Sequence, residues 1–125
     1  MKGLTKAEEQ IMQYLWSLEK GFVKDIVELF PDPKPAYTTV TTIIRILVKK
    51  GFIGFNSYGK VHEYYPLVSK SAYTRQQLRG LVKNYFNGSA RKLVSFFTNE
   101  TDLSLTELEE LKEIIDNQIK EKKDE

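Results

Sequence analysis

Threonine and basic side chains in residues 36–51 recur at the spacing of one helical face. At about 100° per residue, that face carries Thr38, Thr42, Arg45 and Lys49, with Thr41 at its flank. Hydroxyl, methyl and guanidinium groups can contact the base edges and phosphates of DNA when a helix enters the major groove. Because no acidic residue occurs between Lys34 and Glu63, no carboxylate on this face opposes the approach of phosphates. The pattern predicts a DNA-recognition helix.

The alternative is that this is an ordinary amphipathic helix whose polar face only meets water. The opposite face is apolar, as in any surface helix that packs on a core, and carries Val40, Ile43, Ile44 and Leu47. However, β-branched threonines are weaker helix formers than Glu or Lys, so a face selected only for solubility would rarely use several of them. This local cost favours the DNA-binding interpretation.

Two strand-like segments, FIGFN and VHEYYP, follow this helix and are separated by turn residues. Gly59 permits a tight turn, and Tyr58 and Lys60 near its tip can touch a sugar-phosphate backbone. Such contacts position a protein on DNA without reading sequence. An ordinary hairpin turn would carry similar residues, so the prediction of a DNA-contacting wing depends on the helix that precedes it.

Residues that could support catalysis or hold a metal are scarce. The chain has no cysteine, which excludes disulfides and cysteine-ligated metals, and the single histidine, His62, cannot make a common zinc site alone. Glu63 and Tyr64 lie beside His62, but no candidate nucleophile accompanies them, so a structural role is favoured over acid–base chemistry. We therefore expect neither an enzyme nor a cofactor.

The elements that would position the polar face occupy the first 69 residues. Helical spacing of apolar residues runs from Leu4 to Leu18, and Thr5 and Glu8 are placed as a capping box. A second helix is predicted in FVKDIVELF, and the prolines that follow exclude helix before the third. Three helices and then a β-hairpin is the order of a winged helix-turn-helix. We predict a mostly α fold with a small β-hairpin, and residues 1–69 as a winged-helix DNA-binding domain.

Residues 70–121 are predicted to form a helical dimerisation region, and residues 122–125 a disordered tail. Residues 70–92 carry six basic and no acidic side chains, whereas residues 93–125 carry four basic and ten acidic ones. The last two predicted helices are too short to form a core within one chain, so we expect them to pair with a second copy. The residues assigned to this homodimer interface are Leu93, Phe96, Phe97, Leu108, Leu111 and Ile115.

The overall composition is that of a soluble globular protein, with 41% hydrophobic and 29% charged residues and a net charge of +2. No apolar run approaches the roughly 20 residues needed to cross a bilayer. The N-terminus turns acidic too soon for a signal peptide. A cytoplasmic location is therefore expected.

Five collinear stretches resemble the penicillinase-repressor family of winged-helix regulators, over nearly the whole chain. Three of them span the first helix, the third helix with its following strand, and the wing: LTKAEEQIMQYLW, TVTTIIRILVKKGFI and GKVHEYYPLVSKSAY. Two more match the family's C-terminal pattern: YFNGSARKLVSFF and LSLTELEELKEII. No single motif is diagnostic, and the resemblance rests on their shared order and spacing.

The resemblance implies a homodimer that represses transcription from a palindromic operator, which in better-known members controls β-lactamase or methicillin-resistance genes. The family's base contacts map to Thr38, Thr39 and Thr42. Its wing contacts map to Ser57, Tyr58 and Lys60. The resemblance also implies induction through a membrane sensor metallopeptidase, followed by cleavage within the C-terminal region.

Three departures from the family pattern bear on these expectations. Pro35 and Ala36 replace the Trp-Ser that typically opens the recognition helix, so we expect a different operator preference. Phe96 and Phe97 stand where the family usually has its cleaved Asn-Phe bond. The cysteine cluster of the copper-responsive relatives is missing, which disfavours copper sensing.

The predicted function is a sequence-specific transcriptional repressor that binds double-stranded DNA as a homodimer. A two-fold dimer implies an inverted-repeat operator with half-sites about one helical turn apart, or a multiple of that. Two alternatives stay open. A winged-helix protein-interaction module would tolerate acidic substitutions on the threonine and arginine face, and a non-specific architectural DNA binder would scarcely distinguish operator from random DNA.

Overall fold

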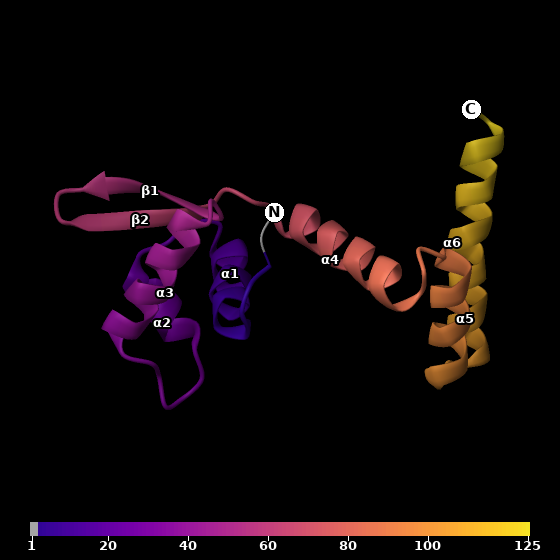
Figure 1. Cartoon of the computed structure of the whole chain (residues 1–125), viewed down its shortest axis with the longest axis horizontal. Helices are drawn as coiled ribbons and strands as arrows, with labels where there is room; N and C mark the ends of the chain where they lie inside the picture. Colours follow the sequence, from indigo (N-terminus) through magenta and orange to yellow (C-terminus); the bar gives the residue numbers. More distant parts are fainter. Residues whose placement is uncertain (1–2) are drawn as a thin grey trace. The chain divides into compact units, whose positions relative to one another are not determined.

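The computed structural model describes residues 3–125, which form two compact units, the first ending at Gln77 and the second spanning Leu78–Glu125. The first unit contains α1 (Lys6–Leu18), α2 (Val23–Leu29), α3 (Tyr37–Lys49), β1 (Ile53–Tyr58), β2 (Val61–Pro66) and the start of α4 (Lys70–Tyr85) (Figure 1). The second contains the rest of α4, α5 (Ala90–Glu100) and α6 (Leu105–Lys123). The prediction of a mostly α fold with a small β-hairpin is confirmed.

The helix starts of the first unit follow from local sequence. At α1, the Glu8 amide donates to Thr5 Oγ1 at 3.2 Å and the Thr5 amide donates to Glu8 Oε1 at 2.9 Å, which is the predicted capping box. At α2, Phe22 has no side-chain oxygen to cap the helix, and its own amide donates instead to the Asp25 carboxylate. At α3, Ala36 provides no side-chain cap, so the orientation of this helix depends on tertiary packing.

The core of the first unit fixes the rotation of α3. Val40, Ile44 and Leu47 are fully buried, in agreement with the predicted apolar face. The residues around them come from α1, α2, the hairpin and α4, and are Ile11, Met12, Leu15, Val23, Ile26, Phe52, Ile53, Tyr64 and Tyr73. Rotation of α3 about its axis would expose these three aliphatic side chains, so the opposite, polar face is held toward solvent.

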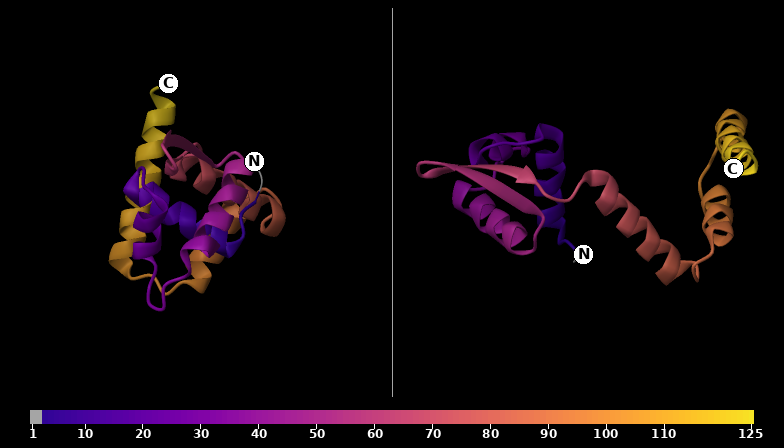
Figure 2. Two further views of the ribbon diagram at one scale, coloured as in Figure 1. Left: turned by 90° about the vertical axis from the view of Figure 1, so that its left-hand side faces the viewer. Right: turned by 90° about the horizontal axis from the view of Figure 1, so that it is seen from above.

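The hairpin pairs β1 with β2 in antiparallel register, and its turn end projects past the helices of its own unit (Figure 1; Figure 2, right). The register places Phe55 opposite Tyr64 and Ser57 opposite His62. Gly59, with φ of +64°, makes the turn. A short bridge joins Gly21 to Tyr64 through two backbone hydrogen bonds of 2.9 and 2.8 Å. This bridge ties the base of the hairpin to the α1–α2 connection.

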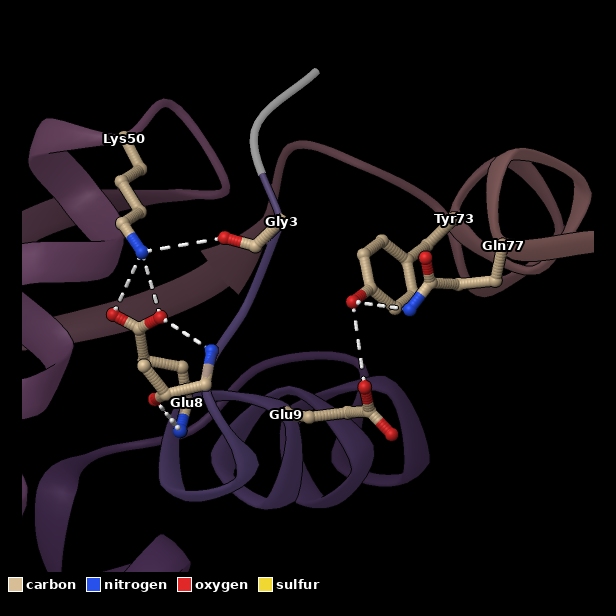
Figure 3. Close-up of polar contacts among 7 residues, drawn as sticks. Gly3, Glu8, Glu9, Lys50, Tyr73 and Gln77 are labelled. Atoms are coloured by element: carbon tan, nitrogen blue, oxygen red, sulfur yellow. Dashed lines mark hydrogen bonds and ion pairs between the residues drawn. The ribbon is translucent and has the colours of Figure 1, made fainter. Parts of the chain in front are cut away.

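The start of α4 belongs to the first compact unit, which ends at Gln77, whereas the predicted DNA-binding domain ends at residue 69. Tyr73 is buried, its ring lies 5.9 Å from those of both Trp16 and Phe52, and its hydroxyl donates to the Glu9 carboxylate at 3.3 Å (Figure 3). Gln77 donates to the same hydroxyl at 3.0 Å. Tyr73 is the buried residue of α4, and its contacts attach the first turns of α4 to α1.

A buried ion pair joins the start of α1 to the end of α3. Lys50 Nζ lies 2.7 and 3.0 Å from the two carboxylate oxygens of Glu8, which is only 4% exposed (Figure 3). Burial alone would raise the pKa of Glu8, but the hydrogen bonds and charge of Lys50 and the hydrogen bonds of Thr5 outweigh it and hold the pKa below the ordinary value of 4.5. Glu8 is therefore more acidic in the folded protein than in the unfolded chain.

Replacing Glu8 with glutamine is expected to lower the free energy of unfolding by about 2 kcal/mol at neutral pH, since a charge-assisted hydrogen bond is lost from a buried site. Because the folded pKa is depressed, the stabilisation is present above the unfolded pKa and is lost as the pH falls through the folded pKa. The difference between parent and variant should therefore shrink in acid. Urea unfolding followed by the fluorescence of Trp16, the single tryptophan, measures both effects.

The matched control is Glu28→Gln, which removes an exposed carboxylate from α2. It should change the free energy of unfolding by less than about 0.5 kcal/mol. Equal stability of the Glu8 variant and this control at neutral pH would contradict the role assigned to the ion pair.

The second unit has helices with defined ends but no buried core. Positive φ angles at Asn87 (52°) and Gly88 (76°) separate α4 from α5, and Ser104 and Glu107 form a capping box at the start of α6. α6 continues to Lys123, into the range 122–125 that the sequence predicts as a disordered tail. Throughout Leu78–Glu125, all of which the structure describes, no side chain is buried.

Candidate nucleic-acid interface

The outer face of α3 presents the hydroxyl and basic groups that the sequence pattern places together. Thr38, Thr42, Arg45 and Lys49 are exposed on it, and Thr39 is exposed beside it. Thr41 is half-buried at its flank. The core contacts of α3 hold all of these residues on one accessible surface of the first unit.

The threonine hydroxyls are partly committed to the helix itself. Thr41 Oγ1 donates to the Tyr37 carbonyl at 3.0 Å, and Thr42 Oγ1 donates to the Thr38 carbonyl at 2.9 Å. With its proton engaged, each oxygen retains lone pairs that can accept a hydrogen bond, and each side chain keeps its methyl group for an apolar contact. These two side chains are therefore suited to accept from a base amino group or to contact a thymine methyl, rather than to donate to a phosphate.

The basic groups of this surface are not neutralised within the chain. Across residues 3–125, none of Arg45, Lys49 and Lys60 forms an ion pair with a carboxylate. Lys50, one residue beyond α3, differs because its charge is satisfied by Glu8. The unpaired cations create a positive potential where the sequence has no acid, which favours a polyanionic partner.

The predicted wing residues lie at the accessible end of the hairpin. Ser57, Tyr58 and Lys60 are all exposed. The Ser57 hydroxyl lies 2.9 Å from His62 Nδ1, and the Tyr58 ring lies 6.4 Å from that of Phe22. His62 also packs on Phe55 with ring centroids 4.5 Å apart, in keeping with the structural role expected for it. The wing tip is thus held by side-chain contacts across the hairpin and by the contact of Tyr58 with Phe22, the residue before α2.

A cleft of about 410 Å³ lies between α3 and the hairpin. It brings together two side chains predicted from α3, Thr41 and Arg45, with one predicted from the wing, Lys60. The other predicted DNA-binding residues do not line it; they are Thr38, Thr39, Thr42, Lys49, Ser57 and Tyr58. Sequence reasoning did not assign the aromatic side chains that line the cleft, among them Tyr37 and Tyr64, to a binding site, because no regular spacing in the sequence brings them together.

Tyr64 is the most deeply buried aromatic residue of this cleft. Burial raises the pKa of its phenol, the nearby Tyr37 adds to the increase, and the positive charge of Arg45 opposes it. The phenol is therefore protonated at neutral pH and can donate a hydrogen bond.

The six residues predicted for dimerisation lie on α5 and α6 and keep accessible surface. Four of them are exposed, namely Phe96, Phe97, Leu108 and Ile115. The other two, Leu93 and Leu111, are half-buried. Phe96 packs on Phe86 with ring centroids 5.6 Å apart. Further apolar side chains of the same unit are exposed but were not predicted for the interface, namely Leu78, Leu81, Tyr85, Val94, Leu105, Ile114 and Ile119.

Neither a metal-binding cluster nor a membrane-spanning helix is found within residues 3–125. No group of three or more His, Asp and Glu side chains is placed to hold a metal ion there. None of the helices in that range combines the length and apolar character needed to cross a bilayer.

The chain is similar to known repressors over almost its full length. Residues 4–117 match the family model described as penicillinase repressor. The methicillin resistance regulatory protein MecI of Staphylococcus aureus (strain N315) is 30% identical over 113 residues, which cover 90% of this chain and 92% of that protein. The penicillinase repressor of Bacillus licheniformis is 25% identical over 122 residues, which cover 97% of this chain and 95% of that protein.

A solved structure supports the fold of the first unit. The DNA binding domain of the repressor BlaI superposes with a TM-score of 0.50 at 23% identity, covering 58% of this chain and 94% of that domain. This likeness confirms the winged-helix fold expected from the order of the elements. From the match of the family model and the identity to MecI, we conclude that the chain belongs to the penicillinase repressor family, which is a family of repressors and not a class of enzyme.

Proposed function

We propose that this chain is a sequence-specific transcriptional repressor that binds an inverted-repeat DNA operator as a homodimer. The observation that carries the proposal is the exposed face of α3, where hydroxyl groups and unpaired cations stand together without a carboxylate. Family membership supports the repressor role, and the name of the related BlaI domain supports DNA as the partner. The regulated genes of the relatives, for methicillin resistance and penicillinase, suggest a resistance operon here too.

In this proposal α3 enters the major groove and the hairpin contacts the backbone beside it. Thr38, Thr39 and Thr42 meet base edges near the start of the helix, where such contacts are made in helix-turn-helix proteins. Arg45 and Lys49 bind a guanine or phosphates further along the same face. Ser57, Tyr58 and Lys60 position the protein through phosphate and sugar contacts, which carry little sequence information.

The homodimer is proposed from the second unit, in which no described side chain is buried. Exposed apolar area on this scale is typical of a surface that another protein covers. Pairing of α5 and α6 with the same helices of a second copy would bury Phe96, Phe97, Leu108 and Ile115, together with Leu93 and Leu111. A two-fold dimer then implies inverted half-sites about one helical turn apart, or a multiple of that.

The inducing partner that the family resemblance implies for this chain is a membrane sensor metallopeptidase. The Phe96–Phe97 bond lies inside α5, so a protease would need that helix to unfold locally before cleaving there. A sensor metallopeptidase gene beside the gene for this chain would support induction by proteolysis. Its absence would favour another route of release.

The DNA-binding role is tested with Arg45→Ala. A duplex is first selected from a random library with the parent chain, and affinities are then measured by fluorescence anisotropy. Because a good arginine contact to a base is worth about 1–3 kcal/mol, the variant should bind this duplex at least about tenfold more weakly.

The control is Lys6→Ala, which removes one exposed positive charge from α1, outside the proposed interface. Its affinity for the duplex should stay within about twofold of that of the parent, because salt screens a charge that lies far from the bound DNA. Equal affinity of the Arg45 variant and the parent would refute the role of Arg45.

A further inference from the structure

We propose that the cleft between α3 and the hairpin binds a small aromatic carboxylate, and that its occupant competes with DNA. The first half of this proposal concerns the cleft alone. The second half rests on the proposed DNA-binding function, because it assigns a regulator to the same surface.

The walls of the cleft are suited to a flat apolar body. Tyr37 lines the cleft from the start of α3 and Phe55 and Val61 from the hairpin, and Tyr64 is its most deeply buried aromatic side chain. A volume of about 410 Å³ falls within the range of about 300–1,000 Å³ that is usual for small-molecule sites. Aromatic side chains from two elements favour an aromatic ring between them, because rings pack well edge-to-face or in offset stacks.

The charged groups of the cleft are both cations that can donate to an acceptor, whereas two other polar side chains, Thr41 and His62, already contact Tyr37 and Ser57. Arg45 and Lys60 line the cleft, and neither forms an ion pair within residues 3–125. No carboxylate lines the cleft. A ligand carboxylate would therefore meet two cations with which no protein group competes, and charge-assisted hydrogen bonds of this kind are the stronger ones.

Tyr64 gives an independent indication that the cleft takes a ligand. It is only 6% exposed, yet in residues 3–125 its hydroxyl has no hydrogen-bond partner. In the same range, no side-chain nitrogen or oxygen is both sealed from solvent and unpartnered. The Tyr64 hydroxyl must therefore reach open space, and the space that Tyr64 lines is the cleft. This hydroxyl has no protein partner and can donate to an acceptor that enters the cleft.

The burial of Tyr64 favours a small molecule, rather than a phosphate of the DNA backbone, as the occupant of the cleft. A duplex rests on exposed side chains such as Arg45 and Lys60, whereas Tyr64 lies below them, nine-tenths buried. A free carboxylate on an aromatic ring can enter between the two elements and reach all three donors. Once there it occupies Arg45 and Lys60, so DNA and ligand exclude each other, and each lowers the apparent affinity of the other.

The probe is 2-naphthoate, titrated into the full chain by isothermal calorimetry without DNA. We expect a Kd of about 1 mM or tighter. Tyr64→Phe, which removes only the hydroxyl, should weaken binding by about tenfold, equivalent to about 1.4 kcal/mol. Lys60→Gln, in the exposed turn of the hairpin, should do the same and keeps the test valid even if the Tyr64 variant is unstable.

Two matched controls accompany these variants. Tyr65→Phe removes a hydroxyl from the next residue of β2, which does not line the cleft, and should bind 2-naphthoate like the parent. The uncharged analogue 2-naphthalenemethanol should bind at least about tenfold more weakly than 2-naphthoate, since it offers the cations no charge. Absence of binding, or equal loss in the Tyr64 and Tyr65 variants, would overturn the cleft as a ligand site.

Competition is measured by adding 2-naphthoate to the complex of the chain with its selected duplex. Release of DNA by the parent, at about tenfold lower concentration than by Tyr64→Phe, supports the second half of the proposal. Calorimetric binding without release of DNA would overturn it. The two proposals fail separately: a chain that binds 2-naphthoate but no DNA refutes the repressor, and one that binds DNA but no 2-naphthoate refutes the cleft.

Discussion

Replacing Leu108 with aspartate is expected to yield monomers and to lower affinity for the selected operator by about 1,000-fold, because the two half-sites are then bound independently. Leu108 is 40% exposed and no neighbour in its unit is buried, so the substitution leaves no cavity within the chain. An acidic residue in the early turns of α6 also suits the dipole of that helix. The loss should therefore fall on the interface between copies. Sedimentation velocity and anisotropy measure the two effects.

The control for this variant is Thr106→Asp, which adds the same charge in the same turn of α6. Thr106 lies about 200° around the helix from Leu108 and is exposed. This variant should remain dimeric and should bind the operator like the parent. A Leu108 variant that sediments as a dimer would contradict the proposed interface, and so would dissociation of both variants.

Replacing Thr42 with glutamate is expected to weaken operator binding by about 100-fold, because it places a carboxylate against the phosphates and removes a methyl group from a base contact. Thr42 is exposed, and its hydroxyl contacts only the Thr38 carbonyl. Glutamate is a better helix former than threonine, so the melting temperature should not fall. Anisotropy and thermal unfolding of the same preparation separate the two effects.

Thr42→Gln is the matched control, since it has the shape of glutamate without the charge. Its affinity for the operator should fall by about tenfold, because it loses the base contact of the threonine methyl group but adds no charge. This comparison also distinguishes the rival functions. A protein-interaction module would show no operator binding to lose and would tolerate the acidic substitution, whereas a non-specific architectural protein would lose affinity equally for every duplex.

Local patterns were sufficient to predict most of the first unit. The apolar spacing of Val40, Ile44 and Leu47 gave the buried side of α3, and its polar side followed from the same periodicity. The capping boxes at Thr5 and Ser104 involve residues three apart, so the sequence contains both partners of each hydrogen bond. Predictions of this kind succeed because the interactions that decide them are local.

Long-range contacts could not be predicted in this way. Tyr64 and Tyr65 are adjacent tyrosines, and nothing in the sequence shows which of the two is buried. In the structure Tyr64 is the buried one, and its backbone pairs with Gly21, which is far away in the sequence. Tyr73 likewise joins α4 to the first unit through residues far away in sequence, including Glu9 and Phe52. The cleft depends on which side of the hairpin meets α3, and alternation within a strand cannot specify that side.

The most direct test of the central claim compares two duplexes at one fixed salt concentration. One is the inverted repeat selected by the chain, and the other has the same composition in shuffled order. Fluorescence anisotropy with the full chain should show binding to the inverted repeat that is at least about 1,000-fold tighter, as expected of a dimer that reads base edges through α3. Equal affinity for the two duplexes, or binding to neither, would contradict the account.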